Sequence, residues 1–330
     1  MIEGRKIFVT GGAGFIGSSL VGRLVDNNQI VIYDNLARDS LKDSMFRDHR
    51  NLTLVRGDIL DYDKLARSMK GADIIIHLAA IAGIDTVIKS PINTMKINLQ
   101  GTVNVLEAAS QLDKLDRLVD FSTSEVFGAY AFRSEENDST ALGAVGNARW
   151  TYAVSKLAAE HLAYSYFTEK KLPTLSIRPF NIYGPGQIGE GAIHHFIVNA
   201  LQNQDITIRG DGDQIRSWCY IDDLVDGVIL CLEKQAAVGH CFNIGNPRGT
   251  ITIHGLGLAV VRVTYSKSKI VYVPRDYADV ELRIPSITKA KKILGFEPKI
   301  GLEEGLRRTA TWYYGKIFNH KIDQAEYIAR

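Results

Sequence analysis

The chain has 330 residues, of which 45% are hydrophobic and 23% charged, and its formal net charge is +2. This balance is typical of a globular protein with a large core, and a length above about 250 to 300 residues favours two lobes or domains. The small net charge gives no basic surface for DNA or RNA, and no run of about 18 apolar residues predicts a membrane span, so we expect neither a nucleic-acid nor a membrane partner.

Cysteine usage also limits the class of protein. Cys219, Cys231 and Cys241 form no C-x-x-C pair and have no histidine nearby at the spacing of metal ligands. This pattern argues against a zinc site and against a disulfide framework. We therefore expect no bound metal and a reducing, cytoplasmic location.

Apolar runs rich in β-forming residues alternate with segments of helical spacing. The alternation predicts a doubly wound, parallel α/β sheet of the Rossmann type, and the nearly continuous hydrophobicity of the runs indicates strands covered on both faces. The expected strands are 6–10, 29–33, 52–56, 74–78, 117–121 and 173–178, and the expected helices include 15–26, 93–112 and 151–168.

The alternation loosens after the sixth strand, where glycines and prolines gather. We expect residues 1–178 to form a first domain and residues 179–330 mainly a smaller α/β lobe. A further expected strand at 241–244 predicts that the chain returns to the first domain at about 213–246.

A glycine-rich turn directly follows the first strand. Gly11, Gly14 and Gly17 have a G-x-x-G-x-x-G spacing, which allows a sharp turn, a close approach to a pyrophosphate and packing of helix on strand. A plain glycine turn is the alternative. Asp34 ends the second strand 23 residues after Gly11, near the offset of about 20 at which an acid binds the adenosine ribose. A carboxylate there repels a 2′-phosphate, so we expect NAD, while Arg38 leaves NADP open.

Polar residues follow the fifth strand and begin the expected helix 151–168. Tyr152 and Lys156 lie one turn apart on one helix face, where the ammonium would lower the pKa of a phenol that is ordinarily about 10. The pair would take a proton from a sugar hydroxyl while hydride leaves the same carbon for NAD. Thr123 would hydrogen-bond that hydroxyl, and Glu125 would move a proton or order a water. For the Tyr152/Lys156 pair, the alternative is an ordinary amphipathic helix. For Glu125, it is an acid at a helix N-terminus.

These motifs resemble, over essentially the whole chain, the extended short-chain dehydrogenase/reductase family of nucleotide-sugar enzymes. The resemblance implies bound NAD, a UDP-sugar substrate and a homodimer formed by helices 93–112 and 151–168. The cofactor contacts that it implies are Gly11, Gly14, Phe15, Ile16, Gly17, Asp34, Asn35, Asp58, Ile59, Leu78, Ala79, Ala80, Asn98, Tyr152 and Lys156. For Asp58, a loop acid that caps a helix is the alternative.

Within the family, residues 123–125, 149–152 and 279–287 resemble the UDP-glucuronate decarboxylases. The resemblance implies that Arg283 lies near the glucuronate carboxylate, whose planar shape a guanidinium matches. A salt bridge between the lobes is the alternative. In the implied mechanism, oxidation at C4 gives a ketone β to the carboxylate, carbon dioxide leaves, and Glu125 orders a water or proton at C5.

Further substrate contacts are implied by the same resemblance. Ser124 would lie at the sugar, and Asn181 and Arg216 would contact the nucleotide diphosphate. A turn-forming asparagine and a surface arginine are the alternatives for the last two.

The residues also rank the competing reactions. Ser124 stands where the 4,6-dehydratases carry an aspartate that protonates the leaving C6 hydroxyl, and Glu125 stands where the 4-epimerases carry small residues that let the keto sugar rotate. UDP-glucuronate decarboxylation is therefore the leading hypothesis, a UDP-sugar 4-epimerase the second and a 4,6-dehydratase the third. A regulator that binds NAD without turnover is the non-enzymatic alternative, against which Thr123, Tyr152 and Lys156 argue. Glu125 remains open as acid, base or spacer.

Overall fold

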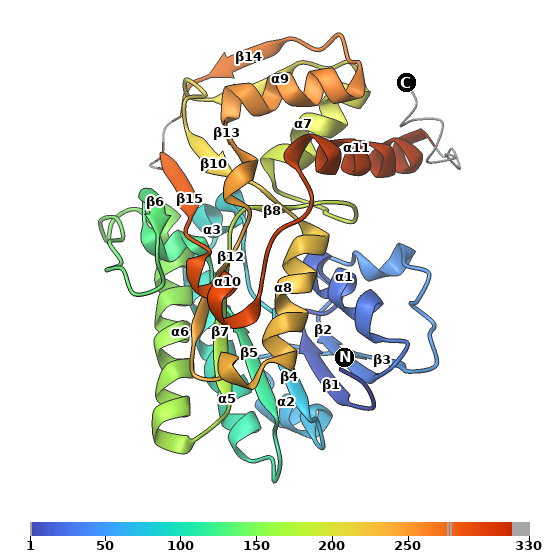
Figure 1. The fold of residues 1–330 in the computed structure, drawn as a ribbon, viewed down its shortest axis with the longest axis vertical. Coiled ribbons are helices and arrows are strands. Elements are labelled where there is room, and N and C mark those ends of the chain that lie inside the picture. The colour runs from blue at the N-terminus through green and yellow to red at the C-terminus, as the bar shows by residue number, and fades with distance from the viewer. Residues whose placement is uncertain (1, 276, 278, 319–330) are drawn as a thin grey trace.

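The large sheet of the protein has seven strands, and every pairing between them is parallel (Figure 1). The computed structural model describes residues 2–275, 277 and 279–318. The strand order is β12-β7-β5-β4-β1-β2-β3, which confirms the expected doubly wound α/β fold. These strands are β1 Lys6–Thr10, β2 Gln29–Asp34, β3 Leu52–Arg56, β4 Ile74–His77, β5 Arg117–Phe121, β7 Thr174–Pro179 and β12 Cys241–Ile244.

Helices cover both faces of this sheet, and its central strands β1, β4 and β5 bury side chains on both sides. The first face packs against α2, α5 and α6 through a cluster that includes Phe8 and Leu118. The second face packs against α1 and α8 through a cluster that includes Ile7 and Val119. The helices around the sheet are α1 Phe15–Leu24, α2 Tyr62–Met69, α3 Ile84–Lys89, α4 Pro91–Met95, α5 Gly101–Ser110, α6 Thr151–Lys170, α8 Ile221–Glu233 and α10 Thr288–Leu294.

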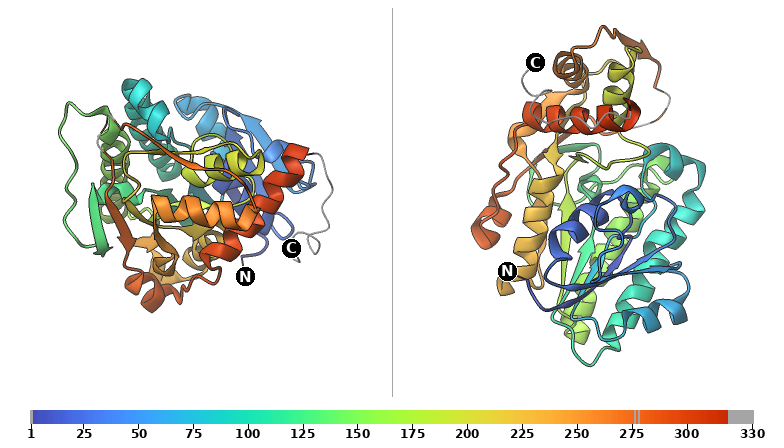
Figure 2. Two further views of the ribbon diagram at one scale, coloured as in Figure 1. Left: turned by 90° about the horizontal axis from the view of Figure 1, so that it is seen from above. Right: turned by 90° about the vertical axis from the view of Figure 1, so that its right-hand side faces the viewer.

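A smaller lobe stands at one end of the large sheet (Figure 2). It contains a four-stranded sheet in the order β13-β10-β15-β6 and the pair β14-β9, and the pair β11-β8 lies where the lobes join. Its strands are β6 Tyr130–Ser134, β8 Ile182–Tyr183, β9 Ile206–Arg209, β10 Ile215–Ser217, β11 Cys219–Tyr220, β13 Thr250–Thr252, β14 Ile270–Val273 and β15 Leu282–Pro285. Its helices are α7 Ala192–Leu201, α9 Ile253–Thr264 and α11 Leu302–Phe318.

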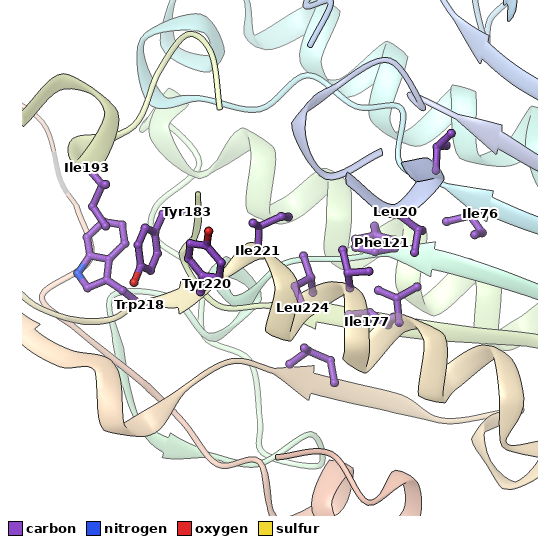
Figure 3. Close-up of a cluster of buried hydrophobic side chains, with 14 of the residues drawn as sticks. Leu20, Ile76, Phe121, Ile177, Tyr183, Ile193, Trp218, Tyr220, Ile221 and Leu224 are labelled. Atoms are coloured by element: carbon purple, nitrogen blue, oxygen red, sulfur yellow. The ribbon is translucent and has the colours of Figure 1, made fainter. Parts of the chain in front are cut away.

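One apolar cluster runs through both lobes (Figure 3). The ring of Tyr183 meets Trp218 and Tyr220 edge to face, with centroids 6.4 and 5.7 Å apart. From there the cluster continues to Phe121 and Ile177 in the large sheet. Burying such side chains contributes about 25 cal/mol per Å² of apolar surface, so the shared core holds the two lobes together.

Candidate active site

The turn after β1 forms a backbone cradle. Gly11 has a φ of +70°, and a Cβ there would lie 2.6 Å from the backbone nitrogen of Ala79. A Cβ on Gly17 would lie 2.6 Å from the carbonyl oxygen of Gly11. Helix α1 begins at Phe15 with Gly14 as its N-cap, so no side chain caps it, and its first turn carries no acid. The N–H groups at this helix end therefore suit a pyrophosphate, and the cradle fits a dinucleotide.

Asp34 lies beside this cradle at the end of β2. Its Oδ2 accepts a hydrogen bond from the Ala13 nitrogen at 3.0 Å, and its Oδ1 accepts one from the Leu36 nitrogen at 2.7 Å. Burial raises the pKa of this carboxyl, and the two backbone hydrogen bonds lower it. Each oxygen has further acceptor capacity, which suits ribose hydroxyls.

Arg38 is the residue that kept NADP possible as the cofactor, and its side chain already makes a hydrogen bond and an ion pair within the protein. Its guanidinium donates to the carbonyl of Ala82 at 3.1 Å and lies 3.6 Å from the carboxylate of Glu190. A guanidinium paired with a carboxylate is less available to a 2′-phosphate, so this geometry favours NAD.

The other expected cofactor residues follow strands β1 to β4, and the strand order reverses between β1 and β4, where such sheets bind ligands. Leu78, Ala79 and Ala80 follow β4 directly. Asp58 accepts a hydrogen bond from the Leu60 nitrogen at 2.9 Å, which shapes the turn before α2. Phe15 and Ile16 are partly buried, Ile59 is buried and Asn35 is exposed.

Asn98 lies in a π-helical segment, Lys96–Gln100, that interrupts the single helix expected over 93–112. The extra residue in this turn aims the side chain inward, a feature typical of π segments at functional sites. The amide accepts a hydrogen bond from the Ile81 nitrogen at 2.7 Å and donates to the Ser155 hydroxyl at 3.0 Å. Asn98 thereby ties the loop after β4 to the helix that carries Tyr152.

Helix α6 places Tyr152 and Lys156 beside the end of β5. The Thr123 hydroxyl lies near enough to the Tyr152 phenol to lower its pKa, and it accepts a hydrogen bond from the Glu125 nitrogen at 3.2 Å. Burial raises the pKa of Tyr152 well above its ordinary value, the Glu125 charge raises it further, and Thr123 lowers it. Burial lowers the pKa of Lys156, while the charges of Asp120 and Glu160 raise it.

Five buried or largely buried charged side chains meet next to Tyr152. Arg149 binds Glu125 through two hydrogen bonds of 2.6 and 3.0 Å and Asp279 through one of 3.1 Å. Arg283 lies 3.6 Å from Glu125, and Arg216 lies 3.5 Å from Asp279. Three guanidiniums against two carboxylates leave this cluster with a net charge of +1.

The small sheet brings two of these arginines together. Strand β15 lies between β10 and β6, and its register pairs Arg283 with Arg216. Paired residues of neighbouring parallel strands project from the same face, so two like charges lie side by side. The Nε atoms of Arg149 and Arg283 are buried without a hydrogen-bond partner among the described residues. An anionic ligand would offset the excess positive charge of the cluster.

The protonation states within the cluster follow from its contacts. Burial raises the pKa of Glu125, but the hydrogen bonds of Arg149 and the charges of Arg149, Arg283 and Arg216 together lower it more, so Glu125 is a carboxylate at neutral pH. Burial lowers the pKa of Arg283 to about 10, and Glu125 raises it, so Arg283 remains a cation at neutral pH. Glu125 is therefore placed as a base or as a fixed negative charge rather than as an acid.

The expected diphosphate contacts make bonds within the protein. Asn181 has a φ of +43°, and its amide donates to the carbonyl of Ser217 at 2.8 Å. Arg216 is 7% exposed, and Ser124 is buried in the turn after Thr123. Arg149 and Asp279 had not been assigned to the site from the sequence. Both residues lie in the sequence segments that resemble the UDP-glucuronate decarboxylases, and that position could have indicated a role in the site.

The cysteines, the potential metal ligands and the helices of the described residues bear on metal binding and on membrane crossing. The three cysteines are free thiols. Across residues 2–275, 277 and 279–318, no group of three His, Cys, Asp or Glu side chains is arranged to hold a metal ion. In the same part of the chain, no helix combines the length and the apolar character that a membrane crossing requires.

The chain is similar to known nucleotide-sugar enzymes. The sequence profile described as "NAD dependent epimerase/dehydratase family" matches residues 7–245. UDP-N-acetyl-alpha-D-glucosaminuronate decarboxylase of Bacillus cytotoxicus is 34% identical over 94% of this chain and 98% of its own. UDP-glucuronic acid decarboxylase 1 of Danio rerio is 31% identical over 99% of this chain and 76% of its own. The structure of UDP-glucuronic acid 4-epimerase from Bacillus cereus with UDP-glucuronic acid and NAD has a TM-score of 0.85 at 30% identity, over 93% of this chain and 98% of that one.

Proposed function

The chain belongs to the NAD dependent epimerase/dehydratase family, and from that premise we propose that it decarboxylates a UDP-linked hexuronate, with UDP-glucuronate as the leading substrate. The observation that carries the proposal is the buried cluster of net charge +1 beside Tyr152. A C6 carboxylate provides the anion that this cluster favours, and Arg283 is the residue proposed to bind it.

The roles of the residues follow from their positions. When bound on Gly11, Gly14, Gly17 and Asp34, NAD supplies a reversible hydride acceptor for C4. Tyr152 takes the proton of the C4 hydroxyl, with the Thr123 hydroxyl holding the oxygen and the Lys156 ammonium favouring the phenolate.

The resulting C4 ketone is β to the C6 carboxylate. The C5–C6 bond breaks, its electron pair moves toward the C4 oxygen as an enolate, and carbon dioxide leaves. Arg283 orients the carboxylate before this step. Glu125, held ionised by Arg149, orders the water that delivers a proton to C5.

A 4-epimerase acting on the same uronate is the second candidate. The cited epimerase from Bacillus cereus is bound to UDP-glucuronic acid, and the arginine cluster would bind a carboxylate that is retained as well as one that is lost. Glu125 argues against it, because contacts with Arg149 and Arg283 fix its side chain beside Tyr152, and a carboxylate there would leave a keto sugar less room to rotate. A 4,6-dehydratase stays third, since Ser124 occupies the place of the acid that it needs.

The test is to incubate the protein with NAD and UDP-glucuronate carrying ¹³C at C6, and to follow the products by mass spectrometry and NMR. Labelled carbon dioxide and a UDP-pentose, or its 4-keto form, are expected. An unchanged mass with UDP-galacturonate would replace decarboxylation with epimerisation. If UDP-glucuronate does not react, UDP-N-acetylglucosaminuronate and UDP-glucose are assayed next, and turnover of UDP-glucose alone would refute the carboxylate assignment.

Substitutions at Arg283 separate binding of the carboxylate from a structural role. We expect Arg283→Met to raise the KM for the uronate about 100-fold while UDP binding changes little, and Arg283→Lys to recover part of the loss. The matched control is Arg117→Lys, because Arg117 is also buried but donates to the carbonyls of Cys231 and Leu232. Equal loss of uronate and UDP binding in Arg283→Met would mean that Arg283 acts only through its contacts with Glu125 and the carbonyl of Gly128.

We also propose a homodimer formed through α5 and α6 and a cytoplasmic location. Val154 and Tyr164 on α6 are 39% and 57% exposed, and Ile92 on α4 is 74% exposed. A second copy would cover such apolar surface. Free cysteines suit a reducing compartment.

A further inference from the structure

A row of polar side chains crosses the large sheet under α5 and α6. The strand registers pair Thr10 with His77, His77 with Asp120, and Asp120 with Ser176. All four are buried. Asp120 shares a sheet face with Leu118, two residues earlier, and Leu118 belongs to the cluster that packs against α5 and α6. The row therefore lies where apolar side chains would ordinarily fill the interface between sheet and helices.

His77 is neutral in this row. Its Nδ1 lies 2.7 Å from the hydroxyl oxygen of Thr10, and its Nε2 lies 3.0 Å from that of Thr102. Burial lowers the pKa of His77 to about 3, and the charge of Lys156 lowers it as well. His77 therefore cannot serve as a counter-ion for the carboxylate beside it.

Asp120 is fully buried, and neither of its carboxylate oxygens has a hydrogen-bond partner among the described residues. The charged groups that act on it are Lys156 and Glu160, both on α6. Arg178 on β7 already binds Glu160 through hydrogen bonds of 3.0 and 2.6 Å. A buried charge is ordinarily retained only near an opposite charge. Helix α6 packs on this face of the sheet and carries Lys156, the buried cation whose charge acts on Asp120 without a hydrogen bond between them.

We propose that Asp120 is a positioning residue that keeps Lys156 in its ammonium form by supplying a buried negative charge from within the sheet. The inference rests on the proposed function, in which Lys156 assists Tyr152. Burial alone favours a neutral amine, and Lys156 is 2% exposed. Asp120 offsets that effect without occupying the cleft where substrate binds.

The sign of the pH dependence follows from the charges. Burial raises the pKa of Asp120 to about 6, while Lys156 lowers it and Glu160 raises it, so Asp120 is mostly ionised at neutral pH. Replacing it with asparagine removes the negative charge and lets Lys156 lose its proton at lower pH. The same charge also raises the pKa of Tyr152. In Asp120→Asn, the acid limit of activity, set by Tyr152, and the alkaline limit, set by Lys156, should therefore both move to lower pH.

The first experiment measures turnover against pH in the full chain with NAD and the UDP-sugar that the wild type converts. We expect Asp120→Asn to move the alkaline limit down by about 1 to 3 pH units, the range for an opposite charge nearby. The matched control is Asp223→Asn, since Asp223 is also a buried aspartate but binds the backbone nitrogens of Lys299 and Ile300. An unmoved alkaline limit in Asp120→Asn, or an equal shift in the control, would overturn the proposal.

A second measurement requires no turnover. Infrared difference spectra against pH should show the carbonyl stretch of a protonated buried carboxyl that titrates near pH 6 and is missing in Asp120→Asn. In Lys156→Met its midpoint should rise, because the cation that favours the carboxylate is gone. If the wild type converts no UDP-sugar, the proposed function fails, but this titration still tests whether Asp120 and Lys156 interact. A midpoint that does not rise in Lys156→Met would refute that interaction.

Discussion

Replacing Glu125 with glutamine should destabilise the protein strongly, although the side chain keeps its shape. The substitution changes the net charge of the arginine cluster from +1 to +2. The closest contact, 2.6 Å to Arg149, corresponds to a Coulomb attraction of about 6 kcal/mol at an effective dielectric constant of about 20. Desolvation offsets part of it, and removing one partner of a buried ion pair costs about 3–5 kcal/mol. We therefore expect that loss in the free energy of unfolding, and a Tm lower by about 4–7 °C.

The assay is urea and thermal unfolding of wild type and Glu125→Gln at several pH values. Because the folded-state pKa of Glu125 is lowered, its contribution is complete above its ordinary value of 4.5 and is lost as pH falls through the lower folded-state value. The stability difference should thus be flat at neutral pH and shrink only in acid. The double variant Glu125→Gln/Arg149→Met should recover part of the loss. The matched control is Glu160→Gln, which breaks a similar pair with Arg178 and should lower stability without altering uronate binding. A neutral-pH stability equal to wild type would refute the reasoning.

Three further outcomes test other parts of the structure. Gly17→Ala should abolish NAD binding in calorimetry, because its Cβ would lie 2.6 Å from a backbone oxygen. The control Gly301→Ala, where the added Cβ meets nothing within 4 Å, should bind NAD normally. Normal NAD binding by Gly17→Ala would contradict the proposed cradle. Glu190 accepts hydrogen bonds from the backbone nitrogens of Asp85 and Thr86 at 2.9 and 3.2 Å, so Glu190→Ala should lower the free energy of unfolding by about 1–3 kcal/mol in urea. Stability equal to wild type would show that these two hydrogen bonds contribute nothing net. Sedimentation should find a dimer, and Tyr164→Glu should dissociate it; a monomeric wild type would rule the interface out.

The central sheet was predictable from the sequence because its signals are local. The runs at 6–10, 52–56 and 117–121 match the observed strands, since short runs rich in β-forming apolar residues predict strands from local sequence alone. The glycine turn was equally readable, because the close approach of Gly11 to the loop after β4 excludes any side chain. The helix expected over 93–112 was only partly right. The hydrogen bonds of Asn98 to distant segments accompany a π turn that helical periodicity does not encode.

What the sequence determined by itself was the order of elements and the kind of chemistry that each turn carries, because glycine spacing, strand hydrophobicity and the Tyr152/Lys156 pair depend on neighbours along the chain. Only the tertiary structure decided which charges meet. Arg149 reaches Glu125 and Asp279, residues 24 and 130 positions away, and a sheet register places Arg216 beside Arg283. Electrostatic energy depends on distance and burial, so the protonation state of Glu125 and the excess charge beside Tyr152 exist only once these segments have folded together.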